Sequence, residues 1–568
     1  MVRRRGARIL VTVAAALAAA VSPLAARAAA AAPDPVQLTV SGRTAVLSNG
    51  LYTVSFDSAG SARSLVIGGR QLIGRARGFY SSVNGSQTFS PTELRVDTDT
   101  ADMADIAYVS PWGELHYVAR SGVSGLYSYF VATGIGTVGE FRTLYRVDGG
   151  IFRNGFNAER SGAFPTLADI QAGTKLQDET FQLQDGTVYT KYDWATYVAQ
   201  DRVHGVYGDG AGVWVISPSH EYFNGGPMKQ ELMVHVESST GDGVVLNMLA
   251  ATHFGNPAIS IPSGKLFGPW LVYFNDGSIP DALAQAGREE AAWPYTWLSN
   301  PQYPLERTEV RGRIHLADGR PAQHAIVTLG QPGGDLYTQG SDYLFSARAN
   351  AFGEFDIPNV RPGTYSLYAF ADAGRIGSVT DQLEVDGIAV GGPSVDLGAL
   401  TWSPPDHGRL LWRIGTADRT AAEFRLGDLP RQYGLFNQVP ADLTYTIDQS
   451  TEANDWYYAQ THVGTWTIAF DLRRVPNGNT AVLTMPVASA SRVPTVQVVV
   501  NGTVVSTLSF GNDQTIYRSG NRSGFYQPEQ ISFPSSLLHP GANTVAFAMT
   551  AVSPGGGIMY DTVQLAVG

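Results

Sequence analysis

Nearly all of the chain after Pro33 consists of short strand-like runs, and this feature limits the fold more than any other. Residues rich in Val, Tyr, Phe, Thr and Leu alternate with Gly, Asn and Asp, as in 51–56 (LYTVSF) and 212–216 (GVWVI). Short runs of this kind, bounded by turn residues, predict β-strands. The best helical pattern covers 279–293, where Pro280 suits a first turn. The sequence therefore predicts an all-β fold.

Composition sets further limits on the chain. Its 568 residues are enough to bury several cores without covalent cross-links, and 44% hydrophobic against 16% charged residues argues against disorder. It has no cysteine, which excludes disulfides, thiol catalysis and cysteine-ligated metals. A net charge of -11 without a long basic run past the N-terminus excludes nucleic acid as a partner. If an acidic protein binds an acidic polymer, it needs local cations at the site.

The N-terminus has the pattern of a secretory signal peptide. Arginines among the first eight residues precede an apolar stretch, 9–21, and Ala26-Arg27-Ala28 offers a small-x-small cleavage site. The stretch is short for a membrane span, which needs about 20 apolar residues. We expect residues 1–32 to be removed and the mature protein to be secreted, extracellular and without a membrane anchor.

Three strand-rich units follow one another. The first covers residues 33–304. The second, 305–403, has turns at the spacing of a small immunoglobulin-like or fibronectin-like sandwich. Ser403-Pro-Pro-Asp-His forms a linker to the third unit, 404–568. There, two β-branched runs meet at Asn501-Gly502, which predicts a hairpin, and the length of the unit fits a jelly roll.

Two segments of the first unit place polar residues on or just after a strand. In 138–147, Glu140, Arg142 and Arg146 share one face of the strand. That face is either an ordinary solvated surface or the wall of an anion-binding site. The buried run 244–252 ends at His253, which is either a structural histidine or a group that faces a cleft.

Lys191 is the third candidate, since Tyr189, Tyr192 and Trp194 surround it in the sequence. Aromatic burial lowers the pKa of a lysine, and a nearby arginine lowers it further. The alternative is a surface lysine whose head group reaches solvent. The acidic stretch 97–105 lacks the spacing of an EF-hand loop, so we interpret it as a solvated turn rather than a calcium site.

With these segments placed, the chain resembles the rhamnogalacturonan lyases of polysaccharide lyase family 4 over nearly everything after the signal peptide. In the first unit the resemblance is carried by Lys191-Tyr-Asp-Trp, Val203-His-Gly, Gly212-Val-Trp-Val-Ile-Ser-Pro-Ser-His-Glu, Gly225-Gly-Pro-Met-Lys-Gln-Glu-Leu and Thr252-His-Phe-Gly. In the later units it is carried by 347–355, Ile357-Pro-Asn-Val-Arg-Pro-Gly-Thr-Tyr-Ser-Leu-Tyr-Ala, Trp412-Arg-Ile-Gly-Thr-Ala-Asp-Arg-Thr-Ala-Ala-Glu-Phe and Met559-Tyr-Asp.

The resemblance implies a catalytic β-supersandwich similar to galactose mutarotase, then a fibronectin-type-III-like sandwich, then a jelly-roll module like those that bind carbohydrate. It implies an endolyase that breaks rhamnose-α-1,4-galacturonate bonds in the backbone of pectin rhamnogalacturonan I by β-elimination, leaving an unsaturated galacturonate end. We expect a monomer that needs no cofactor for the chemistry, and a structural calcium ion is compatible with this expectation.

The resemblance also implies roles for single residues. Lys191 corresponds to the family's catalytic base, His253 to its proton donor, and Arg142 of Gly139-Glu-Phe-Arg142 to the arginine that engages the galacturonate carboxylate. With them we expect Glu140, Tyr189, Tyr192 and His204 to contact substrate. His204 and His235 are further candidates for the acid, ranked below His253. Two tyrosines that line the fungal substrate path are replaced here by Leu246 and Met248, so the subsites differ.

Two other functions remain open on the same fold. A hydrolase needs two carboxylates flanking the bond, and Glu140 with Glu221 is the pair to consider, although nothing in the sequence pairs them. An epimerase belongs to the same alternative. A non-catalytic pectin-binding protein would show affinity without turnover and would be indifferent to the loss of Lys191.

Overall fold

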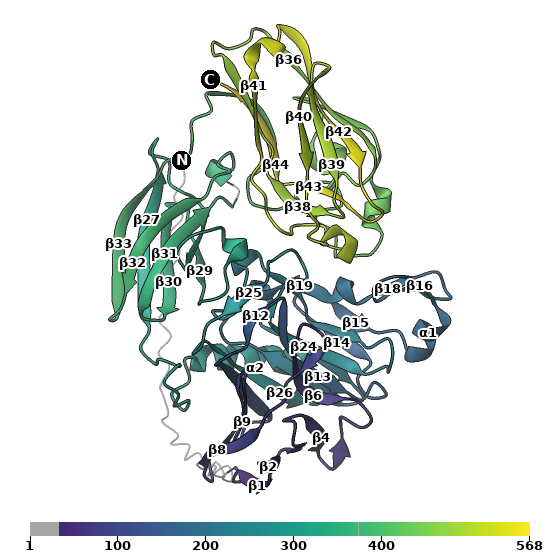
Figure 1. Cartoon of the computed structure of the whole chain (residues 1–568), viewed down its shortest axis with the longest axis vertical. Helices are drawn as coiled ribbons and strands as arrows, with labels where there is room; N and C mark the ends of the chain where they lie inside the picture. Colours follow the sequence, from purple (N-terminus) through teal and green to yellow (C-terminus); the bar gives the residue numbers. More distant parts are fainter. Residues whose placement is uncertain (1–32, 373) are drawn as a thin grey trace, which may run out of the picture.

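The computed structural model describes residues 33–372 and 374–568. Its strands form three groups, within residues 37–275, 308–402 and 409–567, and each group encloses a hydrophobic core (Figure 1). The all-β prediction is confirmed, and the boundaries predicted after 304 and 403 fall in the gaps between these groups. The predicted signal peptide lies outside the described residues. In the part that is described, no helix is long and apolar enough to cross a membrane.

Two large antiparallel sheets face each other in the first domain and share one core. The ten-stranded sheet has the order β1(Gln37–Ser41), β2(Thr44–Ser48), β3(Thr53–Phe56), β4(Ala62–Ile67), β6(Gly78–Val83), β13(Glu140–Val147), β24(Gly243–Ala251), β23(Val234–Val236), with β5(Arg70–Gln71) on β4 and β7(Gln87–Thr88) on β6. The nine-stranded sheet has the order β15(Ser161–Ala163), β14(Asn154–Phe156), β20(Val203–Gly208), β21(Ala211–Ile216), β26(Leu266–Asn275), β11(Gly125–Ala132), β10(Gly113–Arg120), β9(Met103–Ser110), β8(Glu93–Asp99).

The predicted helix is confirmed as α2 (Ile279–Ala292), with Pro280 in its first turn. Its residues Ala282 and Ala286 pack with Trp214 of β21 on the outer face of the nine-stranded sheet. Of the candidate residues, Glu140 and Arg142 lie on β13 of the ten-stranded sheet, and His204 lies on β20 of the nine-stranded sheet.

Strands β13 and β24 are neighbours, and their ends form the candidate site. β24 is an apolar run that is buried at all nine positions, so it lies deep between other elements, as predicted. It ends at Ala251, which pairs with Glu140 at the start of β13. Because the chain leaves the sheet at this point, His253 lies beside Glu140.

Lys191 stands outside both large sheets. A small sheet of β16(Thr174–Gln177), β17(Thr180–Gln182) and β18(Val188–Thr190) leads into a 3-10 turn, Lys191–Trp194. The Thr190 side chain accepts a hydrogen bond from the Tyr192 backbone nitrogen and so caps the turn. The remaining small elements of this domain are α1(Leu167–Ala172), the pair β19(Ala195–Tyr197) with β22(Gln230–Leu232), and the pair β12(Gly136–Val138) with β25(Ile259–Ile261).

The second domain is a sandwich of two small sheets around its own core. One sheet has the order β30(Glu354–Val360), β27(Thr308–Leu316), β33(Ser394–Trp402), and the other β29(Phe345–Arg348), β28(Ile326–Gly330), β31(Gly363–Phe370), β32(Leu383–Val390). Strands β27 and β33 run parallel, whereas the other pairs are antiparallel.

The third domain packs a four-stranded and a five-stranded sheet around a core rich in aromatic residues. Their orders are β34(Arg409–Gly415), β44(Thr562–Val567), β37(Thr480–Thr484), β41(Gln530–Pro534) and β35(Leu443–Thr446), β36(Gly464–Leu472), β42(Gly541–Ala551), β39(Thr495–Val500), β40(Thr503–Ser509), beside the pair β38(Val487–Ser491) with β43(Gly557–Tyr560) and the short α3(Glu452–Asp455). The predicted hairpin is confirmed: Asn501 and Gly502 have φ angles of 46° and 83°, which suit a tight two-residue turn.

The first and second domains meet at a buried carboxylate. Glu221 accepts from Arg361 Nε at 2.7 Å and from Arg307 Nη1 at 2.8 Å, and its side chain is only 2% exposed. Each arginine is also largely buried. Two guanidinium groups from one domain therefore surround a carboxylate from the other.

Replacing Glu221 by glutamine is expected to destabilise this junction by about 3–5 kcal/mol, because it leaves two buried guanidinium groups without their counter-charge. Urea unfolding monitored by tryptophan fluorescence measures the effect. Asp396→Asn is the matched control, since Asp396 pairs with Arg311 on the exposed surface of the second domain. An unchanged Glu221→Gln midpoint would contradict this account of the junction.

The third domain packs against the first beside the candidate site (Figure 1). Ser523 lies 2.8 Å from the Tyr197 hydroxyl and accepts a hydrogen bond at its backbone oxygen from Gln230 Nε2 at 2.7 Å. Arg518, in a 3-10 turn at Ile516–Arg518, donates to the His253 backbone oxygen at 2.7 Å. A loop of the third domain therefore borders the residues at the end of β24.

Candidate active site

Five ionisable side chains form a continuous series of contacts at the ends of β13 and β24. Arg142 Nε lies 3.0 Å from Glu140 Oε1, and Glu140 Oε2 lies 3.3 Å from His253 Nε2. On its other side, His253 Nδ1 lies 2.7 Å from Glu231 Oε2. Glu231 Oε1 in turn lies 2.7 Å from Lys229 Nζ. The imidazole is therefore held between two carboxylates.

Burial changes along this series. The Lys229 and Glu231 side chains are 1% and 0% exposed, whereas Glu140 and His253 are each 15% exposed and Arg142 is 20% exposed. Burial alone would raise the pKa of Glu231, but the charges of Lys229 and His253 lower it to about 2. Glu231 is thus a permanent anion behind the histidine, and the outer three groups reach the surface.

The Arg142 guanidinium has N–H donors, on its two Nη nitrogens, that are available to a ligand. Its Nε is engaged by Glu140 and by Ser82 Oγ at 3.1 Å. No side-chain hydrogen bond within the described part of the chain involves its two Nη nitrogens. A guanidinium edge presented in this way can bind a carboxylate bidentately. This geometry supports the anion-site interpretation of the strand, which stays a prediction.

Lys191 is half-buried against an aromatic ring that it shares with a second cation. Its Nζ lies 5.2 Å from the Tyr192 ring centroid, and Arg518 Cζ lies 4.9 Å from the same centroid. Burial lowers the pKa of Lys191, and the charges of Arg518 and Arg142 add to this effect against the opposing Asp178 and Glu179. The structure thus favours the neutral amine more than an exposed lysine would.

These contacts bring Lys191, Arg142 and His253 into one region. Phe254, which follows His253, packs with Tyr192, which follows Lys191, in one small hydrophobic cluster. Arg518 links the two segments, because it contacts the Tyr192 ring and the backbone oxygen of His253. The three residues with predicted chemistry therefore come together from β13, the 3-10 turn and the end of β24.

Three other candidates use their polar atoms inside the protein. The Tyr189 hydroxyl meets the Val236 backbone, and the buried Tyr192 hydroxyl donates to Asp178 Oδ2. His204 is buried, with Nδ1 2.5 Å from Asp201 Oδ2 and Nε2 2.6 Å from the Leu246 backbone oxygen. Substrate contact by Tyr189, Tyr192 and His204 stays a prediction that these positions do not support.

Sequence reasoning missed Lys229, Glu231 and Arg518. The first two lie in the Gly225-Gly-Pro-Met-Lys-Gln-Glu-Leu segment, so they were visible as part of a resemblance. The contact of Glu231 with His253, and that of Lys229 with Glu231 and the backbone near His253, depend on how two strands are placed. Arg518 is 265 residues from His253 in sequence, and no local pattern marks it. Leu246 and Met248, where the fungal enzymes have tyrosines, are fully or almost fully buried in the core.

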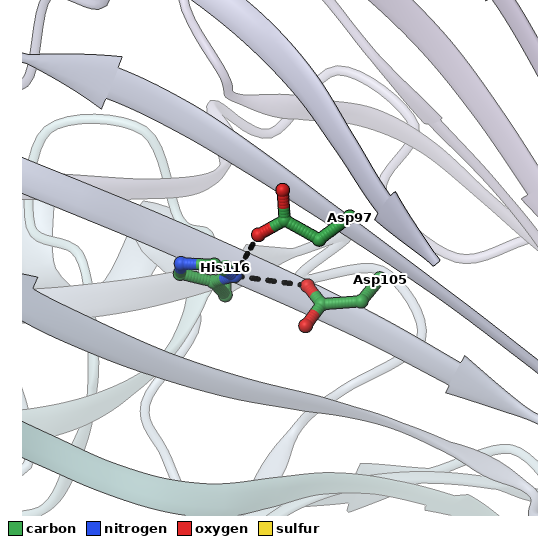
Figure 2. A group of neighbouring side chains, drawn as sticks. All are labelled: Asp97, Asp105 and His116. Atoms are coloured by element: carbon green, nitrogen blue, oxygen red, sulfur yellow. Dashed lines mark hydrogen bonds and ion pairs between the residues drawn. The ribbon is translucent and has the colours of Figure 1, made fainter. Parts of the chain in front are cut away.

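The interpretation of the acidic stretch 97–105 as a solvated turn is right for Asp99 and Asp102, which are exposed where the chain turns between β8 and β9, and wrong for Asp105, which is buried. Asp97 lies in β8, and Asp105 lies in β9 with its side chain buried. Figure 2 shows both carboxylates directed toward His116 of β10, whose Nδ1 lies 2.9 Å from Asp105 and 3.7 Å from Asp97. Linear spacing did not reveal this cluster, because its members meet across strands.

Asp97, Asp105 and His116 are the one group of three potential metal ligands (His, Asp or Glu) among the described residues whose ligand atoms lie within 4.8 Å of one another. Burial lowers the pKa of His116, but hydrogen bonds to Asp105 and Glu114 outweigh it and raise that pKa above its usual value. Arg95 binds both oxygens of Asp97. The raised pKa of His116 and the Arg95 guanidinium both favour charge balance with these carboxylates inside the protein, and a donor set with a histidine nitrogen does not suit calcium.

Comparison with known proteins identifies the family of the chain. The protein-family model described as rhamnogalacturonan lyase B, N-terminal, matches residues 75–291. The family models described as polysaccharide lyase family 4, domain II and domain III, match residues 317–389 and 410–565. The rhamnogalacturonate lyase of Dickeya dadantii is 38% identical over 94% of this chain and 95% of its own length. The rhamnogalacturonate lyase B of Emericella nidulans is 25% identical over 95% of this chain and 96% of its own. Because these matches cover all three domains in one order, the chain belongs to polysaccharide lyase family 4, the rhamnogalacturonate lyases.

Proposed function

We propose that this protein is an endolyase that cleaves the rhamnose-α-1,4-galacturonate bond of rhamnogalacturonan I by β-elimination. One observation carries the proposal: Arg142 with free donors, Lys191 with a lowered pKa, and His253 held between carboxylates lie in one site. Elimination from a uronate needs these three functions: neutralisation of the carboxylate, a base for the C5 proton, and an acid for the departing oxygen.

Arg142 serves the first function. While the galacturonate carboxylate is charged, its C5 proton is only weakly acidic. The two Nη donors pair with that carboxylate and stabilise the enolate-like charge that develops on it. This cation also meets the requirement set by the overall net charge of -11, since an acidic protein that binds a polyanion needs local positive charge.

Lys191 and His253 complete the reaction. Neutral Lys191 takes the C5 proton, and the electron pair of the C5–H bond forms the C4–C5 double bond while the bond from C4 to O4 breaks. His253 Nε2 gives its proton to O4, which remains on the rhamnose as its new reducing end. The other product carries an unsaturated galacturonate at its non-reducing end.

Hydrolysis is the weaker alternative, because its proposed carboxylate pair does not form. Glu221 is committed to Arg307 and Arg361 at the domain junction, and Glu140 pairs with Arg142 and His253. The membership of the family argues against an epimerase and against a protein that only binds pectin.

The setting of the reaction is also a proposal. The N-terminal pattern supports secretion, and pectin is an extracellular substrate. Arg142 supplies the positive charge at the carboxylate, so we propose that the chemistry needs no metal. We further propose that the mature protein acts as a monomer, and that residues 33–304, 305–403 and 404–568 are its domains.

The pH dependence of kcat/KM is expected to follow the protonation of Lys191. The base must be neutral, so the rate rises with pH through its pKa. Arg518→Gln removes a positive neighbour, stabilises the charged amine and raises that pKa. The ascending limb of the profile should therefore move to higher pH. Arg288→Gln, on exposed α2, removes the same charge far from the site and should leave the limb unchanged. A limb that stays in place in Arg518→Gln would argue against Lys191 as the base.

The proposed function is tested with purified mature protein and rhamnogalacturonan in the presence of a chelator. Ultraviolet absorbance of the conjugated product should rise, and homogalacturonan, which lacks rhamnose, should give no rise. New reducing ends without absorbance would indicate a hydrolase. Affinity without either signal would indicate a binding protein.

A further inference from the structure

Behind the candidate acid lies a buried ion pair that the elimination itself does not use. Lys229 Nζ and Glu231 Oε1 are 2.7 Å apart, and neither side chain is more than 1% exposed. Removing two charges from water is costly, and apolar replacements of similar size often stabilise a core as well or better. The pair is therefore weak evidence for stability, and its position suggests another role.

The pair is joined to the segment that carries His253. Lys229 Nζ donates to the Ala251 backbone oxygen at 2.5 Å and to Asn256 Oδ1 at 3.0 Å. These two residues lie on either side of His253 in the chain. Glu231 Oε2 reaches the imidazole itself, at 2.7 Å from Nδ1. The ion pair thus contacts both the backbone around the histidine and its ring.

The closer of the two carboxylates around the ring, Glu231, decides which nitrogen keeps its proton. Glu231 is a carboxylate that only accepts hydrogen bonds, so the proton on Nδ1 stays there in both charge states of the ring. The proton on Nε2 is then the one that leaves. Nε2 lies on the more exposed side, facing Glu140 of β13 at 3.3 Å, and Arg518 of the third domain binds the backbone oxygen of His253.

We propose that Glu231 is the positioning residue of His253 and that Lys229 keeps it anionic, so that Lys229, Glu231 and His253 act as one buried unit. This rests on the proposed function, in which His253 protonates O4. In each turnover the Nε2–H bond breaks and an O4–H bond forms, while Nδ1 keeps its proton and its hydrogen bond to Glu231. Solvent restores the Nε2 proton after the product leaves.

Glu231→Gln tests the unit, because it keeps the shape and removes the charge. Loss of an orienting partner of this kind lowers kcat on the order of 10²-fold, with KM changed little. The neutral amide can turn either its oxygen or its nitrogen toward Nδ1, so it no longer fixes the tautomer of the ring. Glu290→Gln is the matched control, since it removes an exposed carboxylate that pairs with Arg202.

Glu231→Gln leaves Lys229 buried without its partner, so a second variant is needed to separate a loss of stability from a loss of positioning. The double variant Lys229→Met/Glu231→Gln removes both charges, and we expect its unfolding midpoint to stay close to that of the wild type. It should nevertheless keep the low kcat. A purely structural pair would instead recover normal kcat in the double variant, and that recovery would overturn the proposal.

A readout without substrate separates this inference from the proposed function. Nitrogen-15 spectra of histidine-labelled protein show which ring nitrogen carries the proton, and His253→Gln identifies the signal among the 10 histidines. We expect protonated Nδ1 in the neutral ring of the wild type and a mixture of tautomers in Glu231→Gln. The same tautomer mixture in both proteins would overturn the positioning role. Failure to produce unsaturated uronide, with the tautomers as expected, would refute the proposed function alone.

Discussion

Replacing Lys191 by methionine is expected to lower kcat on rhamnogalacturonan by about 10²–10⁴-fold, the usual contribution of a general base. Methionine keeps the length and the packing on the Tyr192 ring but offers no basic nitrogen. Binding of the polymer depends mainly on Arg142 and the surface around it, so KM should change little. Initial rates of absorbance increase measure the loss.

Lys175→Met is the control for this variant. Lys175 is an exposed lysine on β16 and lies near the Phe181 ring, so its removal is a similar change of charge outside the site. If Lys191→Met retained more than about a tenth of the activity, the base would lie elsewhere. A loss of less than about 10-fold is smaller than the smallest contribution expected of a general base, about 10²-fold.

Replacing His253 by alanine should lower kcat by a similar factor, about 10²–10⁴-fold, for a different reason. Without a proton donor, O4 must leave as an alkoxide. The defect therefore depends on the leaving group, and a synthetic galacturonide with a phenol at C4 should react nearly as fast in the variant as in the wild type. Lys191→Met should stay slow on this substrate, because C5 proton removal is still required. Equal defects on both substrates would exclude His253 as the acid.

The other nearby histidines are poorer donors. Burial and the charge of Lys191 lower the pKa of His235 to about 4, so it is neutral over most of the pH range and has no proton to give. His204 is fixed between Asp201 and the Leu246 backbone. His539→Ala, on the exposed surface of the third domain, is the control for loss of a histidine as such.

Local patterns predicted much of the fold for a physical reason. Strand, turn and hairpin propensities act over a few residues, so β24, α2 and the turn at Asn501-Gly502 were visible in the sequence. Position at the end of a buried strand also marked His253. Arg142 was recognised as an anion-binding candidate because alternation along β13 placed it on one face with Glu140.

Contacts between distant segments were not predictable in this way. The approach of Glu231 to His253 depends on the placement of β22 beside the end of β24. The contact of Arg518 with Tyr192 depends on how the third domain packs on the first. The pairing of Asp105 with His116 depends on strand register in the nine-stranded sheet. In each case the deciding interaction is non-local, and no spacing in the chain reports it.

The masses of the products test the central claim of elimination most directly. Oligosaccharides released from a defined rhamnogalacturonan fragment are separated and weighed by mass spectrometry. Elimination adds no water, so the two product masses should sum to the mass of the parent, and the piece with the new uronate end should be one water lighter than its saturated form. Products whose masses sum to the parent plus one water would show hydrolysis and contradict the roles given to Lys191 and His253.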